Sequence, residues 1–316
     1  MPEFRARSCL ETASGHPYKH VPVLLNEVVD FLRPYPAGVY VDATLGEGGH
    51  AEAILRASAP DGRLIGLDRD REVLGRACQR LSAFGERVYI AHRLASEMRS
   101  VVHELGLSCV DGVLLDLGVS SYQLEAPERG FSFLHEGPLD MRMDRTHGET
   151  AAMLINRLAE PDLIALIQGY AEERWARRIA RAIVRARRRK PLQTTAELAA
   201  LVTQVIPPAA RPPRIHPATR TFQALRIAVN QELTALERTL PEAAMCLCEG
   251  GRLCVIAYHS LEDRIVKQTF RRLEQAPPAP SFALRVLTRK PVTASPAERR
   301  ANPRARSAKL RVLERL

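Results

Sequence analysis

The chain has 316 residues, 46% of them hydrophobic, which suffices for a buried core and for about two domains. Lys and Arg outnumber Asp and Glu by 46 to 36, and the formal net charge of +10 favours a polyanionic partner, nucleic acid first. A generally arginine-rich proteome would give the same excess. No run of about eighteen apolar residues occurs, so no membrane span is predicted, and the N-terminal residues lack the apolar segment of a secretory signal.

The six cysteines lack the paired CxxC spacing of a zinc site, and no metal is predicted. Cys246 and Cys248 stand two apart in an apolar stretch, which is typical of core residues. We therefore expect free thiols, as in a protein of a reducing compartment, and a cytoplasmic location. The cysteines are Cys9, Cys78, Cys109, Cys246, Cys248 and Cys254.

Residues 1–18 show no regular pattern, and from residue 20 amphipathic patterns alternate with short apolar runs. Helices are predicted at 20–32, 49–58, 71–83 and 96–105, and strands at 39–41, 63–68, 88–91 and 110–117. This alternation predicts an α/β fold with a parallel, doubly wound sheet, in which ligands bind beyond the carboxyl ends of the strands. Three acids, Asp42, Asp68 and Asp116, stand at such ends.

Residues 127–216 show no pattern of a buried strand. They contain helical patterns at 161–170, 172–189 and 195–205, and prolines such as Pro212 and Pro213 mark the exit. The sheet pattern then resumes, with helices predicted at 221–248 and 261–274 and strands at 252–258, 284–287 and 309–313. We therefore expect one discontinuous α/β domain, 1–126 with 217–316, and an inserted all-helical domain, 127–216.

The glycine-rich loop between the first strand and its helix, Gly46-Glu-Gly-Gly-His-Ala51, fits the G-x-G-x-x-G/A fingerprint of a dinucleotide site. Asp42 and Glu47 flank the glycines, however, and two carboxylates near a pyrophosphate would cost a few kcal/mol. S-adenosylmethionine carries a sulfonium and an ammonium group, which acids attract. Asp68, at the end of the next strand, suits the two ribose hydroxyls. This arrangement is typical of a class I (Rossmann-like) methyltransferase.

From His20 onward, the chain resembles the bacterial RsmH/MraW family, the small-subunit rRNA cytidine-N4-methyltransferases. The resemblance rests on several short strings in fixed order. They are His20-Val-Pro-Val-Leu24, the loop from Gly46 to His50, Leu67-Asp-Arg-Asp70, Asp116-Leu-Gly-Val-Ser-Ser121, Glu128-Arg-Gly-Phe-Ser-Phe133, Gly137-Pro-Leu-Asp-Met-Arg-Met-Asp144, Tyr170-Ala-Glu-Glu-Arg174, Thr219-Arg-Thr-Phe-Gln-Ala-Leu-Arg-Ile227, His259-Ser-Leu-Glu-Asp-Arg-Ile-Val-Lys267 and Asn302-Pro-Arg-Ala-Arg-Ser307.

The resemblance implies S-adenosylmethionine as cofactor and, as substrate, one cytidine in the P-site region of 16S rRNA. It implies a class I methyltransferase domain with an inserted helical substrate domain. Where the family has an aromatic residue after the third strand, this chain has Ala95, which cannot stack on adenine. The implied cofactor contacts, together with the acid and first glycine of the loop, are Asp42, Gly46, Gly48, Gly49, His50, Asp68, Asp116 and Gln123.

Cytosine N4 is a poor nucleophile, because its lone pair is delocalised into the ring. Acceptors for the N4 hydrogens would make the nitrogen more tetrahedral and take up the leaving proton. By resemblance, such acceptors lie between Asp116 and Ser121, with Ser120 the individual choice. Asp140 and His259 are further candidates. Asp140 could instead pair with Arg142, and His259 could instead cap the helix that follows it.

Arginines recur at helical spacing on one face of residues 172–190, and Trp175, Ile179, Ile183 and Ala186 fall on another. We expect the apolar face to pack inward and the arginines to contact RNA. A solvated charged surface is the alternative. The arginines of this face are Arg174, Arg178, Arg181, Arg185 and Arg188. A second basic cluster is Arg299, Arg300, Arg304, Arg306, Lys309 and Arg311.

Three other functions stay open at this point. One is a methyltransferase that acts on DNA or protein, and another is a catalytically silent RNA-binding assembly factor. The third, an NAD-dependent oxidoreductase, is disfavoured by the acidic loop and by the lack of an evident Tyr-x-x-x-Lys pair. The oligomeric state is also open, and a homodimer is one option.

Overall fold

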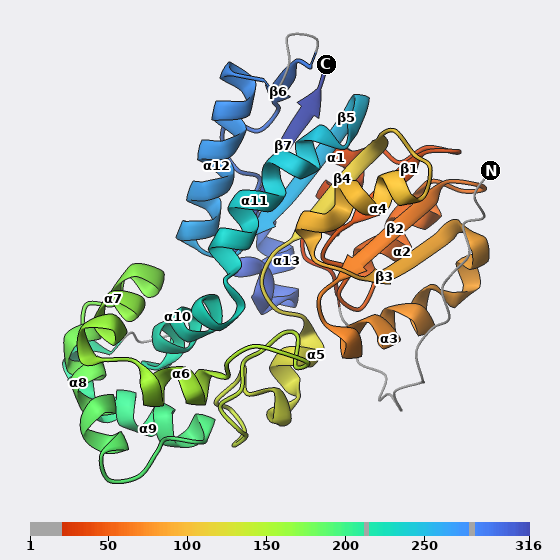
Figure 1. Ribbon diagram of the computed structural model, residues 1–316. Coiled ribbons are helices and arrows are strands. Elements are labelled where there is room, and N and C mark those ends of the chain that lie inside the picture. The colour runs from red at the N-terminus through yellow and green to blue at the C-terminus, as the bar shows by residue number, and fades with distance from the viewer. Residues whose placement is uncertain (1–20, 212–214, 278–281) are drawn as a thin grey trace. The chain divides into compact units, whose positions relative to one another are not determined.

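The structure is a computed structural model that describes residues 21–211, 215–277 and 282–316 (Figure 1). The expectations for residues 1–20, for Cys9 and for the Pro212-Pro213 pair lie outside these residues. The chain divides into two compact units, Met1–Ser120 with Leu233–Leu316, and Ser121–Glu232. The second unit contains all of 127–216, together with residues on both sides of that range. Within the described ranges, no helix is long and apolar enough to cross a membrane.

The first unit is built on a seven-stranded sheet with the order β3-β2-β1-β4-β5-β7-β6. The five strands from β3 to β5 in this order pair in parallel, and β7 runs antiparallel to both β5 and β6. The predicted parallel sheet and its closing pair of strands are therefore confirmed. The strands are β1 Val39–Asp42, β2 Arg63–Asp68, β3 Val88–His92, β4 Val110–Asp116, β5 Leu247–Ala257, β6 Leu284–Val286 and β7 Lys309–Arg315.

Helices cover both faces of this sheet because its strands are apolar on both sides. Within β1, Tyr40 packs on one face while Val39 and Val41 pack on the other, as the alternation of strand side chains requires. Two hydrophobic cores result. One contains α1 Leu25–Leu32, α2 Gly49–Ala57 and α3 Arg71–Leu81, and the other contains α4 Met98–Glu104, α11 Glu232–Met245 and α12 Ser260–Gln275.

The second unit is helical, as the sequence predicts, and its described residues contain no strand longer than an isolated bridge. The single helix predicted at 221–248 is wrong. The chain turns at Gln231, whose φ is +50°, and the second helix ends at Met245, after which Leu247 already pairs with β4. The helices of the unit are α5 Ser121–Glu125, α6 Ala151–Arg157, α7 Glu160–Ala171, α8 Ala176–Arg187, α9 Thr195–Val205 and α10 Thr219–Asn230.

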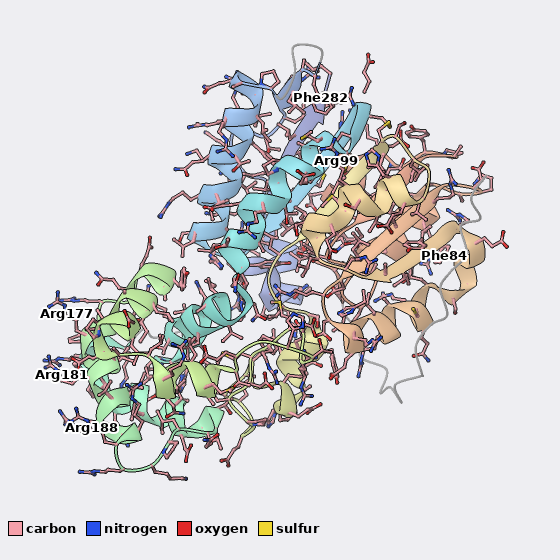
Figure 2. The ribbon with its side chains drawn as sticks, viewed as in Figure 1. Phe84, Arg99, Arg177, Arg181, Arg188 and Phe282 are labelled. Carbon is pink, nitrogen blue, oxygen red and sulfur yellow. A yellow bond between two sulfur atoms is a disulfide. The ribbon has the colours of Figure 1, made fainter. Side chains whose placement is uncertain are left out.

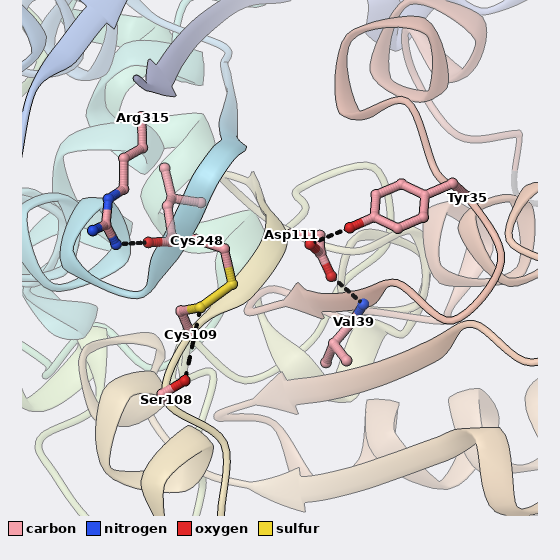
Figure 3. Close-up of a disulfide and its surroundings, with 8 residues drawn as sticks. Tyr35, Val39, Ser108, Cys109, Asp111, Cys248 and Arg315 are labelled. Atoms are coloured by element: carbon pink, nitrogen blue, oxygen red, sulfur yellow. Dashed lines mark hydrogen bonds between the residues drawn. A yellow bond between two sulfur atoms is a disulfide. The ribbon is translucent and has the colours of Figure 1, made fainter.

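The expectation of free thiols is wrong for two cysteines, because Cys109 and Cys248 form a disulfide (Figure 3). Their Cα atoms lie 5.0 Å apart, although 139 residues separate them in the chain. The neighbouring residues Val110 and Leu247 are register partners in the parallel pair β4–β5, and this pairing brings the two cysteines together. Of the remaining described cysteines, Cys246 and Cys254 are buried and free.

Candidate functional site

Three acids mark one edge of the sheet in the first unit. Asp42 ends β1, Asp68 ends β2 and Asp116 ends β4. Because these three strands are parallel neighbours in the sheet, their carboxyl ends emerge at the same edge. The predicted convergence of the three carboxylates follows directly from this topology.

The loop after β1 is held by the acid of β2. Oδ2 of Asp68 accepts a hydrogen bond of 2.9 Å from the amide of Gly46, and Oδ1 accepts one of 2.9 Å from the amide of Asp70. Gly46 and Gly48 have φ values of +54° and +78°, which L side chains rarely adopt. Gly49 begins α2, so the loop delivers the chain directly into a helix N-terminus.

Asp42 is a buried carboxyl, with 1% of its surface exposed. Burial, together with the neighbouring charges of Asp116 and Asp68, raises its pKa to about 8 against the opposing hydrogen bonds from Thr44. Burial also raises the pKa of Asp68 to about 6, against the opposing hydrogen bonds from Asp70 and Gly46. Two neighbouring carboxyls that resist ionisation create a place where a positive charge would be stabilised.

Asp116 is anchored from three elements. Its amide donates to Oγ1 of Thr44 at 2.6 Å, which ties the end of β4 to the loop after β1. Its Oδ1 accepts a hydrogen bond of 2.7 Å from the hydroxyl of Tyr258, the residue after β5. Its Oδ2 lies 3.5 Å from Nδ1 of His50 in α2. The carboxylate therefore has a defined orientation at the carboxyl edge of the sheet.

His50 is buried, and burial lowers the pKa of its imidazole to about 4. Its Nε2 lies 2.9 Å from the carbonyl oxygen of Val23, and a carbonyl can only accept. The neutral ring therefore carries its proton on Nε2, and Nδ1 is the atom that faces Asp116. His50 links the segment before α1 to the acid of β4.

These residues fit S-adenosylmethionine, the cofactor expected from the sequence. The donor set consists of carboxylates and backbone amides, with two buried carboxyls whose pKa values are raised. An ammonium and a sulfonium group would relieve the repulsion among these acids, whereas a pyrophosphate would increase it. Asp68 would accept from the ribose hydroxyls, and Asp42 would face positive charge.

The remaining catalytic candidates have other visible partners. Both carboxylate oxygens of Asp140 accept from Arg142, at 2.8 and 2.9 Å, and the pairing foreseen as the alternative is what the structure shows. His259 accepts from the amide of Glu262 and so caps α12, which was also foreseen. Ser120 is half-buried in the loop after β4. Asp116, at the end of β4, and Ser120, in the loop that follows, therefore remain the candidates for accepting the N4 hydrogens.

Two further sequence predictions concern Gln123 and the position of Ala95. Gln123 lies in α5 of the second unit and is 4% exposed. Ala95 is half-buried and packs against the core that contains α4. The neighbouring Leu94 has 46% of its surface exposed, so its side chain does not pack into the core in place of the missing aromatic ring.

The basic face predicted for residues 172–190 lies on α8. Ile179 and Ile183 are buried, and Figure 2 shows Arg177, Arg181 and Arg188 extending away from the ribbon. The guanidinium groups of Arg174 and Arg178 lie 5.6 and 4.9 Å from the ring centroid of Trp175. All the arginines predicted for this face are exposed: Arg174, Arg178, Arg181, Arg185 and Arg188.

The second basic cluster is only partly available to a ligand. Lys309 and Arg311 both bind Asp263, at 3.1 and 2.6 Å, and Arg311 is buried. Arg304 is half-buried and Arg306 is exposed in the short helical turn Pro303–Arg306. The C-terminal basic surface is therefore smaller than the sequence suggests.

Sequence reasoning missed Thr44 and Tyr258, which both hold Asp116. A usable signal was present for Tyr258, because it directly follows a strand of the same parallel sheet. For Thr44 the signal was weaker, since a threonine two residues after the acid is common in any turn. Neither residue was assigned a role because only the fold shows which neighbour each one reaches.

Comparisons with known proteins agree with this geometry. Residues 17–316 match the profile of a family described as the MraW methylase family. A protein from Geobacter sp. (strain M21), named Ribosomal RNA small subunit methyltransferase H, is 52% identical over 309 residues, or 95% of this chain and 99% of that protein. One of the same name from Symbiobacterium thermophilum is also 52% identical, over 95% of this chain and 97% of its own. A solved structure of a putative rRNA methylase from Clostridium thermocellum is 13% identical, with a TM-score of 0.43, and covers 94% of this chain and 100% of that one.

Proposed function

Since this chain belongs to the MraW methylase family, we propose that it methylates the exocyclic N4 of a cytidine in the P-site region of 16S rRNA, with S-adenosylmethionine as the methyl donor. The observation that carries the proposal is the acidic site at the strand ends, with Asp42 buried and Asp68 and Asp116 half-buried, which suits a cationic cofactor. The relatives are named for small-subunit ribosomal RNA, which supports the same substrate class here. An enzyme with this substrate would act in the cytoplasm, but the Cys109–Cys248 disulfide removes the free-thiol argument for that location.

When bound, S-adenosylmethionine supplies an electrophilic methyl group on a sulfonium. In the proposed reaction, the cytidine amine would take this methyl group from the sulfonium. One N4 proton must then leave. We infer that Asp116 would accept it, because the Tyr258 hydroxyl donates to its carboxylate and Thr44 accepts from its backbone amide at the strand end. Asp68 and the glycine loop hold the cofactor, and their main contribution to the reaction rate is to align the methyl group with N4.

The target base must leave its stack before its amino group can be methylated, which requires tight binding of the flanking RNA. The arginine face of α8 supports such binding, since its exposed guanidinium groups carry the charge that phosphates attract. Trp175 adds an aromatic ring between two of these arginines. Arg304 and Arg306 extend the basic surface of the first unit.

Labelled S-adenosylmethionine incubated with 30S subunits or free 16S rRNA, followed by nucleoside mass spectrometry, tests this function. We expect N4-methylcytidine at one rRNA position. Transfer of label to DNA or protein would support a different methyltransferase. RNA binding without transfer, by a protein that still binds the cofactor, would support an assembly factor. Binding of NAD in place of S-adenosylmethionine would contradict the proposed cofactor site.

A further inference from the structure

We propose that Tyr258 is a positioning residue, whose hydroxyl orients the Asp116 carboxylate and keeps it ready to accept a proton. Asp116 ends β4, and Tyr258 directly follows β5, its parallel neighbour in the sheet. The register pairs Asp116 with Ile256, and the amide of Leu117 donates to the carbonyl of Ile256 at 3.0 Å. Backbone pairing alone therefore fixes the two strand ends relative to each other.

The contact itself is a strong type of hydrogen bond. The phenol of Tyr258 donates to Oδ1 of Asp116 at 2.7 Å, and a neutral donor to a carboxylate stabilises the charged form of the acceptor. Burial and the nearby Asp116 charge raise the pKa of Tyr258 well above its usual value. Tyr258 therefore keeps its proton at every working pH and always acts as the donor.

Tyr258 is held on both sides. Its amide donates to Oε2 of Glu262 at 2.8 Å, within the capped first turn of α12. Its ring packs against the core that contains α1 and α2. The ring is therefore restrained, and its hydroxyl restrains the Asp116 carboxylate through one hydrogen bond.

The charged groups around this pair come from several elements. Asp42 in β1 is a neighbouring carboxyl, and the charge of Asp116 contributes to the rise of the Asp42 pKa. His50 in α2 lies 3.5 Å from Oδ2 but is neutral. Glu262 and Arg304 also act on Tyr258, with opposite signs. In this acidic setting, loss of the phenol donor would make Asp116 harder to ionise.

The variant Tyr258→Phe removes the hydroxyl and keeps the ring. In protein labelled with ¹³C at the aspartate carboxyls, an NMR titration without cofactor should show the Asp116 pKa about one unit higher, as loss of one charge-assisted hydrogen bond predicts. Asp116→Asn assigns the resonance. Tyr40→Phe is the matched control, because Tyr40 belongs to the same core of the first unit but its hydroxyl accepts from the amide of Tyr35, and the acid that acts on it is Asp111 rather than Asp116. An unchanged Asp116 pKa in Tyr258→Phe would overturn the proposal.

A second experiment measures kinetics. It rests on the proposed function, and its outcome is independent of the titration. Tyr258→Phe should lower kcat about tenfold, leave KM for S-adenosylmethionine unchanged and move the acid limb of the pH–rate profile upward. Asp116→Asn/Tyr258→Phe should be no slower than Asp116→Asn alone, because the phenol acts through the carboxylate. Additive losses in the double variant, or the same profile shift in Tyr40→Phe, would show a general structural role instead. Absence of rRNA methylation in the unaltered protein would count against the proposed function and leave the titration result standing.

Discussion

The amide of Gly46 donates a hydrogen bond of 2.9 Å to Oδ2 of Asp68, and this contact joins the glycine loop after β1 to the end of β2. The same carboxylate accepts from the amide of Asp70 through its other oxygen. One side chain therefore shapes the loop, and it is the acid that we propose for the ribose. In this proposal, loop geometry and cofactor recognition depend on a single residue.

Asp68→Ala should accordingly lower the affinity for S-adenosylmethionine at least about 100-fold, because two hydrogen bonds to a charged group and their support of the loop are lost together. Isothermal calorimetry measures the change. Asp30→Ala, an exposed acid on α1, is the control for loss of one negative charge. Undiminished affinity in Asp68→Ala would refute the ribose assignment.

Cofactor binding should release close to one proton near pH 7. The pKa of Asp42 is about 8, so the carboxyl is mostly protonated without ligand, and nearby positive charge would lower this pKa and ionise it. Calorimetry in buffers of different ionisation enthalpy counts the protons released. Asp42→Asn should abolish the release. An equal release in this variant would assign the proton to another group.

The same carboxyl predicts how stability without cofactor depends on pH. Its folded-state pKa of about 8 is raised above the unfolded value of about 3.9, so its contribution is fully present below pH 4 and is lost as the pH rises through 8. Between these limits the free energy of unfolding should fall less steeply in Asp42→Asn than in the unaltered protein. Denaturant titrations across this range provide the measurement, and parallel curves would contradict it.

The arginine face of α8 should contribute directly to RNA affinity. Arg185→Glu/Arg188→Glu should weaken binding about tenfold or more and reduce the slope of log affinity against log salt by about 1.5, if two phosphate contacts are lost. Arg271→Glu/Arg272→Glu, on exposed positions of α12, makes the same change in net charge and serves as the control. Equal effects of the two double variants would mean that only overall charge matters.

The Cys109–Cys248 disulfide should stabilise the first unit by about 2–4 kcal/mol, because it closes a long loop in the unfolded chain. Mass spectrometry without reductant detects the bond, and denaturant unfolding with and without reductant measures its effect. The variant Cys109→Ser should resemble the reduced protein, whereas Cys246→Ser, which removes a free thiol and leaves the disulfide, should still respond to reductant. Insensitivity of unfolding to reductant would show that the bond does not contribute.

Variants of Asp140 and Arg142 distinguish a structural role of the Asp140 carboxylate from a catalytic one. Burial opposes its ionisation, but hydrogen bonds from Arg142 outweigh burial and place its pKa below the usual value. The pair should therefore stabilise the second unit above about pH 4, the unfolded pKa of an aspartate, and lose this effect as the pH falls. We expect Asp140→Ala and Arg142→Ala to lower both thermal stability and turnover to a similar degree. Loss of turnover in Asp140→Ala alone, at unchanged stability, would instead indicate a catalytic carboxylate.

Much of the fold was readable from the sequence because its signals are local. The apolar runs that end in Asp42, Asp68 and Asp116 predict parallel strands whose acids meet at one edge, and the structure places them there. The amphipathic pattern around Ile179 and Ile183 likewise predicts which face of α8 is buried. Periodicity reports burial, and burial follows from the hydrophobic effect acting on short stretches of chain.

Other features depended on contacts between distant segments. The helix predicted at 221–248 ends early because pairing with β4 draws Leu247 into the sheet, which outweighs its local helical pattern. The disulfide joins residues whose separation in the chain carries no hint of their proximity. Tyr258 reaches Asp116 only because β5 lies beside β4. Hydrogen bonds and covalent pairing require particular atoms to meet within a few ångströms, and that coincidence is set by strand order and register, which only the folded chain specifies.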